Sequence, residues 1–134
     1  MKKNEYEYKV SENGLCYVKE IDCRFKFEYV DYYKKEKNAV YIAADDIDIS
    51  ELILRTKRDG DVFSPSGLKG TKKVKKYFID QKIPSHKRHF YPLLVLKDEI
   101  LAILPLRVNN NRKVIHTTEK ILKITFCGGT YDEQ

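Results

Sequence analysis

Apolar and polar residues alternate along several short stretches of the chain, which is the pattern of strands that bury one face. The clearest example is 21–30, where five apolar side chains share one face and charged side chains occupy the other. The Asn13-Gly14 pair is a hairpin signal between the first two predicted strands. Strands are predicted at 6–10, 15–19, 21–30, 39–44, 52–58, 92–97, 99–104 and 122–126.

One stretch has helical spacing instead. Thr71 has the side chain of a helix N-cap, and the spacing that follows predicts a main helix over about 71–82, stopped by Pro84. Three apolar side chains within it share one face, and lysines fill the opposite face. A short second helical turn is predicted at about 85–90. The sum is an α+β fold of mostly antiparallel strands with one main basic helix.

The length of 134 residues, or 15.8 kDa, predicts a single domain over 1–134. A chain of this mass buries about 68% of its surface, so it can form a core without disulfides. The longest uncharged apolar run, 100–106, is too short to span a membrane, and no hydrophobic region follows the first lysines. Cys16, Cys23 and Cys127 are odd in number and form no C-x-x-C pair, so their role stays open. We therefore expect a cytoplasmic protein without a membrane partner.

The excess of positive charge is concentrated in the middle of the chain. Residues 1–52 hold 9 basic and 12 acidic residues, 53–96 hold 11 and 3, and 97–134 hold 6 and 5. The net charge of +6 is therefore located in the central third. Such a local field predicts a polyanionic partner: nucleic acid, an anionic membrane or an acidic protein.

Motifs for catalysis and metal binding do not match. The sequence has no G-x-S-x-G arrangement, and its histidines (His86, His89 and His116) lack zinc-site spacing. The stretch 67–73 departs from G-x4-G-K-[ST], because Thr71-Lys72 follows Gly70. We predict no catalytic residue, no metal site and no cofactor within this chain.

A phosphate site is predicted around 67–73. Gly67 and Gly70 allow close approach to backbone amides, and a helix start at Thr71 would add unpaired N–H groups, so we expect an anion near 70–72. The alternatives are a solvated lysine face, a general nucleic-acid binder, and an anionic-lipid binder, which would lack an exposed apolar face. The surrounding cations are Lys69, Lys72, Lys73 and Lys76, extended by Lys82, Lys87 and Arg88.

Residues 54–73, LRTKRDGDVFSPSGLKGTKK, resemble a signature of the C-terminal domain of tRNA(Ile)-lysidine synthetase. The resemblance continues through 78–84, FIDQKIP, then Arg88 and 92–94, and more loosely through 99–101 and 120–126. It covers about 52–127. Residues 1–51 are a strand-rich N-terminal part that carries no signature.

The family's enzyme uses ATP to adenylate the wobble cytidine of an isoleucine tRNA and then joins lysine to it. The resemblance implies that this domain holds the tRNA, chiefly its acceptor stem, while a separate domain reacts. The Ser-Gly-Gly-x-Asp-Ser loop of that ATP-binding domain is absent here, so this chain alone is not expected to be an enzyme. ATP and lysine would belong to the absent catalytic domain, which joins tRNA as an expected partner. The oligomeric state is not determined by the sequence.

The family signature also implies individual roles. Asp61 and Asp80 cannot contact phosphate favourably, so we expect them to orient arginines or cap turns. Val62 and Lys87 depart from the family pattern, where an arginine and an acidic residue are frequent. An alternative is a scaffold domain that packs on its parent enzyme through the acidic first 52 residues. The expected phosphate contacts are Arg55, Arg58, Lys69, Lys72, Lys73, Lys76, Lys82 and Arg88, and the expected loop-shaping residues are Gly67, Gly70, Asp61, Asp80 and Pro84.

Overall fold

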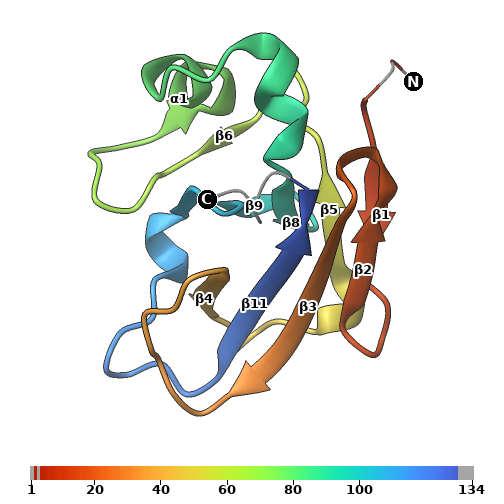
Figure 1. Ribbon diagram of the computed structural model, residues 1–134. Coiled ribbons are helices and arrows are strands. Elements are labelled where there is room, and N and C mark those ends of the chain that lie inside the picture. Colours follow the sequence, from red (N-terminus) through yellow and green to blue (C-terminus); the bar gives the residue numbers. More distant parts are fainter. Residues whose placement is uncertain (1, 3, 130–134) are drawn as a thin grey trace.

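The computed structural model describes residue 2 and residues 4–129. It is an α+β fold in three layers: a four-stranded sheet, a five-stranded sheet behind it, and a smaller layer that contains the helix (Figure 1). Every strand pairing among the described residues is antiparallel, in agreement with the predicted fold class. The hairpin predicted at Asn13-Gly14 is wrong, because the strands on its two sides pair with other partners in different sheets. No helix among the described residues is long and apolar enough to cross a membrane.

The five-stranded sheet has the order β1-β5-β8-β9-β10. Its centre is the hairpin predicted around Asp98, and a register shift between Leu94 and Val95 marks a bulge there. Its edge strand β1 comes from the N-terminal part and pairs with β5. Its strands are β1 (Glu7–Lys9), β5 (Leu52–Arg55), β8 (Leu93–Leu96), β9 (Glu99–Ile103) and β10 (Arg107–Val108).

The four-stranded sheet has the order β2-β3-β11-β4, so the last strand of the chain inserts between two N-terminal strands. The alternation predicted at 21–30 is confirmed over most of its length, but Asp22 adopts a left-handed conformation (φ 47°), so the strand begins at Cys23. Its strands are β2 (Leu15–Val18), β3 (Cys23–Val30), β11 (Ile121–Gly128) and β4 (Ala39–Ala43).

The five-stranded sheet separates two hydrophobic cores. The larger core fills the space between the two sheets, and both N-terminal and C-terminal strands contribute to it. The smaller core lies on the other face, between that sheet and the helical layer. Neighbouring residues of β8 demonstrate this division, because Leu94 belongs to the first core and Leu93 to the second.

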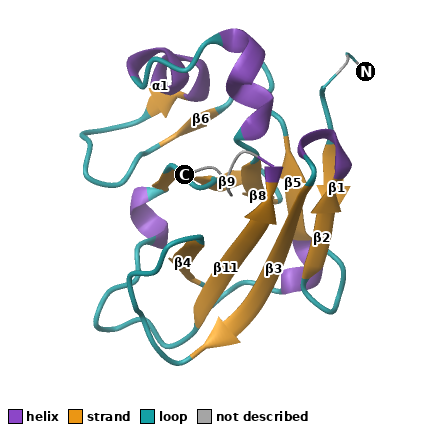
Figure 2. Cartoon of the chain, viewed as in Figure 1, coloured by secondary structure: helices purple, strands orange, loops and turns teal. Residues whose placement is uncertain are grey.

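The third layer consists of a two-stranded hairpin, β6 (Val62–Phe63) and β7 (Lys72–Lys73), followed by α1 (Val74–Asp80). The predicted turn at 85–90 is confirmed as the 3-10 helix η3 (Ser85–Phe90). Figure 2 shows that this layer holds most of the helical residues. The remaining 3-10 helices are η1 (Lys19–Ile21), η2 (Ile49–Glu51) and η4 (Asn110–Arg112).

The helix is shorter than the predicted 71–82, but its buried face is as expected. Val74, Tyr77 and Phe78 are buried, and Phe63 packs edge-on against Tyr77 with ring centroids 5.3 Å apart. Because these side chains fix one face of α1, the lysines on the helix are directed away from the sheet.

Candidate nucleic-acid interface

The loop between β6 and β7 presents Lys69 to solvent. Gly67 and Gly70 both have positive φ, 78° and 73°, so the prediction that they shape this loop is confirmed. The side-chain oxygens of Ser64 and Thr71 lie 3.0 Å apart and close the base of the loop. Thr71 therefore ties the hairpin together and does not cap the helix as predicted.

The start of α1 corrects the predicted anion site. Lys72 and Lys73 pair with Phe63 and Val62 in the hairpin, and the helix begins at Val74. The N–H of Val74 already donates to the carbonyl oxygen of Asp61 at 2.9 Å. The predicted helix start near Thr71 is therefore wrong, because the pairing of Lys72 and Lys73 in the hairpin takes precedence over the local capping signal. The lysines, and not the helix terminus, remain as the anion-binding groups.

Asp61 orients an arginine, as expected. Both terminal nitrogens of Arg55 donate to its carboxylate, and the backbone N–H of Arg58 donates to it at 2.7 Å. Burial acts to raise the pKa of Asp61, but these hydrogen bonds outweigh burial and hold the pKa below its usual range. Arg55 is only 8% exposed, so the structure contradicts its expected contact with phosphate. Arg58 is exposed but forms an ion pair with Glu7.

Asp80 organises two lysines on one side of α1. Its carboxylate lies 2.7 Å from the Nζ of Lys72 and 3.0 Å from the Nζ of Lys76. Hydrogen bonds from these two lysines hold the pKa of Asp80 below its usual value. Asp80 therefore orients two lysines and not the expected arginine, and Lys72 and Lys76 are partly neutralised before any ligand binds.

Lys82 and Arg88 lie where α1 ends. Lys82 has a left-handed conformation (φ 59°), and its N–H and that of Ile83 bond back to Ile79 and Phe78, which is a Schellman ending. The helix ends at Asp80, before Pro84 and two residues earlier than predicted, and Pro84 directly precedes η3. Arg88 donates from Nε to the carbonyl oxygen of Ile83 at 3.0 Å, which fixes its guanidinium beside the helix end.

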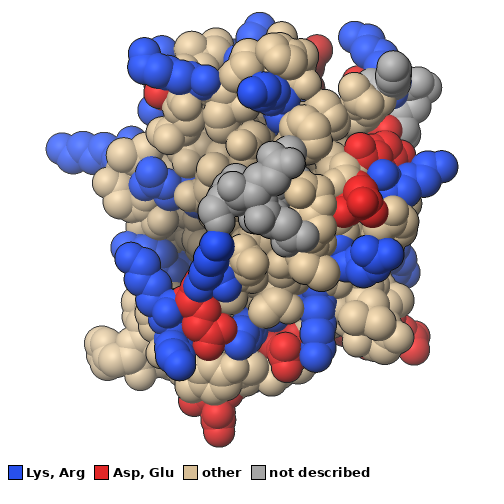
Figure 3. All heavy atoms as spheres, viewed as in Figure 1, with Lys and Arg blue, Asp and Glu red and all other residues tan. Residues whose placement is uncertain are grey.

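The exposed cations of the third layer form a surface that we term the basic layer. Lys69, Lys73, Lys75, Lys82 and Lys87 are exposed, and none of them forms an ion pair with another residue that the structure describes. In Figure 3 the charged side chains over the upper part of the molecule are mainly Lys and Arg. The basic layer comprises these five lysines with Lys72, Lys76 and Arg88.

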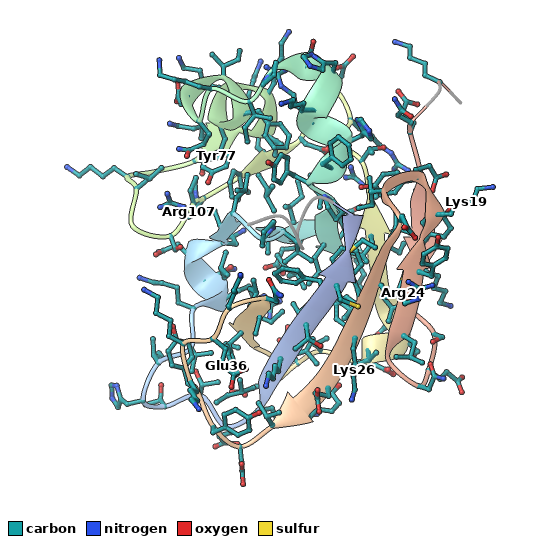
Figure 4. The ribbon with its side chains drawn as sticks, viewed as in Figure 1. Lys19, Arg24, Lys26, Glu36, Tyr77 and Arg107 are labelled. Carbon is teal, nitrogen blue, oxygen red and sulfur yellow. The ribbon has the colours of Figure 1, made fainter. Side chains whose placement is uncertain are left out.

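Arg107 is a cation that the sequence pattern did not identify. It lies on β10, and its NH1 donates to the carbonyl oxygen of Ser66 at 2.7 Å, beneath the β6–β7 loop (Figure 4). Its guanidinium also lies 5.9 Å from the ring centroid of Tyr77. No local motif marks this residue, because its neighbours in space lie 30 to 41 positions earlier in the chain.

The other groups of chemical interest among the described residues are potential metal ligands and the cysteines. Within residue 2 and residues 4–129, no group of three or more His, Cys, Asp or Glu side chains could hold a metal ion. Cys16 and Cys23 are buried, and Cys127 is exposed. Burial raises the pKa of Cys16 to about 11, which keeps it as an unreactive thiol.

A domain model and the sequences of known proteins identify the same family. A domain described as the TilS substrate C-terminal domain matches residues 52–122. The tRNA(Ile)-lysidine synthase of Caldanaerobacter subterraneus is 33% identical over 109 residues, which are 81% of this chain and 21% of that protein. The enzyme of Clostridium tetani is 40% identical over 96 residues, 70% of this chain and 21% of that protein. The chain thus spans about a fifth of the length of these relatives.

The fold is shared with a solved structure. A crystal structure of a TilS C-terminal domain aligns with a TM-score of 0.74 at 20% identity, and the alignment covers 92% of this chain and 97% of that one. The resemblance first seen at 54–73 is confirmed by the domain match, which includes the β6–β7 hairpin, α1 and η3. Since that match covers more than half of the sequence, the chain belongs to the family of TilS substrate C-terminal domains.

Proposed function

We propose that the chain is the tRNA-binding module of a tRNA(Ile)-lysidine synthase. In this proposal the basic layer holds the tRNA at its acceptor stem, while a separate ATP-dependent domain attaches lysine to the wobble cytidine. The relatives named above are tRNA(Ile)-lysidine synthases, which supports tRNA as the ligand.

The proposal is carried by one observation: exposed lysines without ion-pair partners among the described residues lie on the third layer, and packing and hydrogen bonds hold the backbone of that layer in place. Val74, Tyr77 and Phe78 anchor α1 in the smaller core, and Asp61 fixes the start of the hairpin through Arg55. Lysines are compact charges on flexible stems, which suits contacts to phosphates rather than readout of base edges. The basic layer would therefore contact the phosphates of an RNA duplex and position that duplex on the protein, with little dependence on the nucleotide sequence.

A salt titration tests the electrostatic part of this function. About 4–6 neutralised phosphates would give a slope of roughly −3 to −5 for log affinity against log salt concentration. Lys69→Ala and Lys73→Ala should each weaken tRNA binding and reduce the slope by about 1. Lys26→Ala is a matched control, because Lys26 lies on the outer face of the four-stranded sheet, far from the third layer in the strand order. A flat salt response would contradict tRNA binding through phosphates.

One observation favours a second function, a scaffold within the parent enzyme. Leu15 and Tyr17 on the edge strand β2 are about half exposed, at 50% and 46%, and could pack against another domain. A flat salt response, together with binding of a separately produced catalytic domain that Leu15→Asp abolishes, would favour the scaffold.

A further inference from the structure

A groove of about 560 Å³ joins two segments that are far apart in the sequence. One side is formed by the connection that leads into β4, with Tyr33, Lys35 and Glu36. The other side is formed by residues around β10, with Arg107, and by Ser66 of the β6–β7 loop. Its volume lies within the range of roughly 300–1,000 Å³ that is usual for ligand pockets. In Figure 4, Arg107 and Glu36 lie on the same side of the molecule.

An exposed aromatic ring stands on the wall of this groove. Tyr33 is 62% exposed, and its ring centroid lies 5.2 Å from that of Tyr41, which is buried. Tyr32 packs edge-on against the same buried ring at 6.0 Å. Tyr33 is therefore supported from one side and open to a ligand on the rest of its surface.

The connection that carries Tyr33 is held in place by Lys123 of β11. The Nζ of Lys123 forms an ion pair with Glu36 at 2.8 Å and donates to the hydroxyl of Tyr32 at 3.0 Å. The hydrogen bond from Lys123 holds the pKa of Glu36 below its usual range, so this carboxylate stays charged and paired. A wall fixed in this way loses little conformational freedom when a ligand binds.

The groove is also positive. Its one acidic lining residue, Glu36, is neutralised by Lys123, whereas Lys35 and Arg107 form no ion pair with any residue in the described part of the chain. Arg107 uses NH1 for Ser66, which leaves other N–H groups of its guanidinium for an anion. Ser66 connects the groove to the loop that presents Lys69, so the groove continues the basic layer.

From this arrangement we propose that the groove binds an unpaired nucleotide of RNA, with its base stacked on Tyr33 and its phosphate against Lys35 and Arg107. Stacking on an aromatic side chain needs a free base face, which an RNA duplex hides and an unpaired segment offers. This inference rests on the proposed function, since the basic layer would hold the adjoining duplex. It adds a second part to the recognition, which distinguishes a duplex that ends in unpaired nucleotides from a blunt one.

The test compares two labelled RNAs by fluorescence anisotropy: a short blunt duplex, and the same duplex with a single-stranded 3′ overhang. The intact chain should bind the overhang duplex more tightly. Tyr33→Ala should weaken binding of the overhang duplex by about tenfold, which is the size of change expected when one stacked base is lost. Its affinity for the blunt duplex should stay unchanged. Tyr33→Phe should retain the preference, because the ring is kept. Tyr17→Ala should not alter the preference for the overhang duplex. It removes an exposed tyrosine of β2, at the edge of the four-stranded sheet opposite β4.

The outcomes separate this inference from the proposed function. If both duplexes bind equally, and Lys73→Ala weakens both, the groove proposal is overturned while phosphate binding stands. If neither RNA binds, both proposals are overturned. A hexaglutamate peptide that binds the groove more tightly than the overhang, and loses affinity in Tyr33→Ala, would assign the groove to an acidic protein segment and also overturn the proposal.

Discussion

Arg55 and Asp61 form a bidentate ion pair, with donor–acceptor distances of 2.8 and 2.9 Å, at the junction of β5 and the third layer. Both side chains are almost fully buried, at 10% and 12% exposure. The pair therefore connects the five-stranded sheet to the start of the β6–β7 hairpin, and it explains why an acidic residue is retained within a basic segment.

Asp61→Asn should destabilise the fold by about 3 kcal/mol, because it leaves the charge of Arg55 buried without its partner. Urea denaturation would measure the loss as a lower midpoint with an unchanged slope. Asp59→Asn is the matched control, since the Asp59 side chain is fully exposed, and its free energy of unfolding should stay close to that of the original chain. Equal effects of the two substitutions would contradict the structural role of Asp61.

The same pair predicts a pH dependence. Because the pKa of Asp61 is lowered in the folded chain, its contribution to stability is complete above the unfolded value of about 3.9 and is lost as pH falls through the folded value. The difference in unfolding free energy between the original chain and Asp61→Asn should be constant from about pH 7 to 5 and narrow below about pH 4. A difference that does not change across this range would contradict the lowered pKa.

Lys73→Ala and Phe78→Ala should separate the two faces of the third layer. Phe78 is fully buried in the smaller core, so its truncation should cost about 3–5 kcal/mol. Lys73 is exposed, and its truncation should cost under about 0.5 kcal/mol. Thermal unfolding followed by circular dichroism would show the contrast. Similar losses would mean that Lys73 has a structural role.

Asp80→Asn should strengthen RNA binding by about two- to threefold at low salt, because it removes a carboxylate that competes with phosphate for Lys72 and Lys76. The gain should vanish at high salt, where charges are screened. The control is Asp98→Asn, a change at an exposed hairpin turn outside the basic layer. Weaker binding by Asp80→Asn would show instead that Asp80 is needed to hold both lysines in position.

Tyr41→Phe should leave the free energy of unfolding unchanged or raise it. The buried hydroxyl of Tyr41 forms no well-aligned hydrogen bond with a described group, although the charges of Glu36 and Lys123 act on its pKa, so its removal loses no well-formed bond. Tyr29→Phe is the control. Tyr29 lies on β3, which β11 separates from the β4 strand of Tyr41, and its hydroxyl donates to the carbonyl oxygen of Ile47 at 2.6 Å, so this variant should lose about 1 kcal/mol. A marked loss in Tyr41→Phe would reveal a partner for the hydroxyl.

The sequence predicted most of the sheets because a half-buried strand has a period of two residues. The alternation at 21–30 and 122–126 became β3 and β11, which pair along their full lengths. The short turn at Asp98 correctly joined β8 to β9. The order of the strands in the sheets was not predictable. No local signal encodes the pairing of β11 with β3 and with β4, the two strands between which it inserts.

The candidate site was predicted less completely, since burial and partners depend on distant segments. The lysine face of α1 followed from helical spacing. The buried pair of Arg55 and Asp61 did not, because a charged residue in a strand gives no indication of whether a partner will fold over it. The helix start was misplaced because Thr71 satisfies a local capping rule, while the pairing of Lys72 with Phe63 depends on a hairpin closed nine residues apart.

The alternation of Leu93 and Leu94 between two cores has a consequence for how the chain folds. A five-stranded sheet that supports both cores cannot complete one without forming the surface for the other, so loss of either should propagate through β8. Residues 52–122 would lack β1 to β4 and most of β11, and the face of β5, β8 and β9 that bears Leu94 would be left in water. The segment by which the family is identified thus holds only part of the larger core, and the signature-free N-terminal part supplies side chains that complete it.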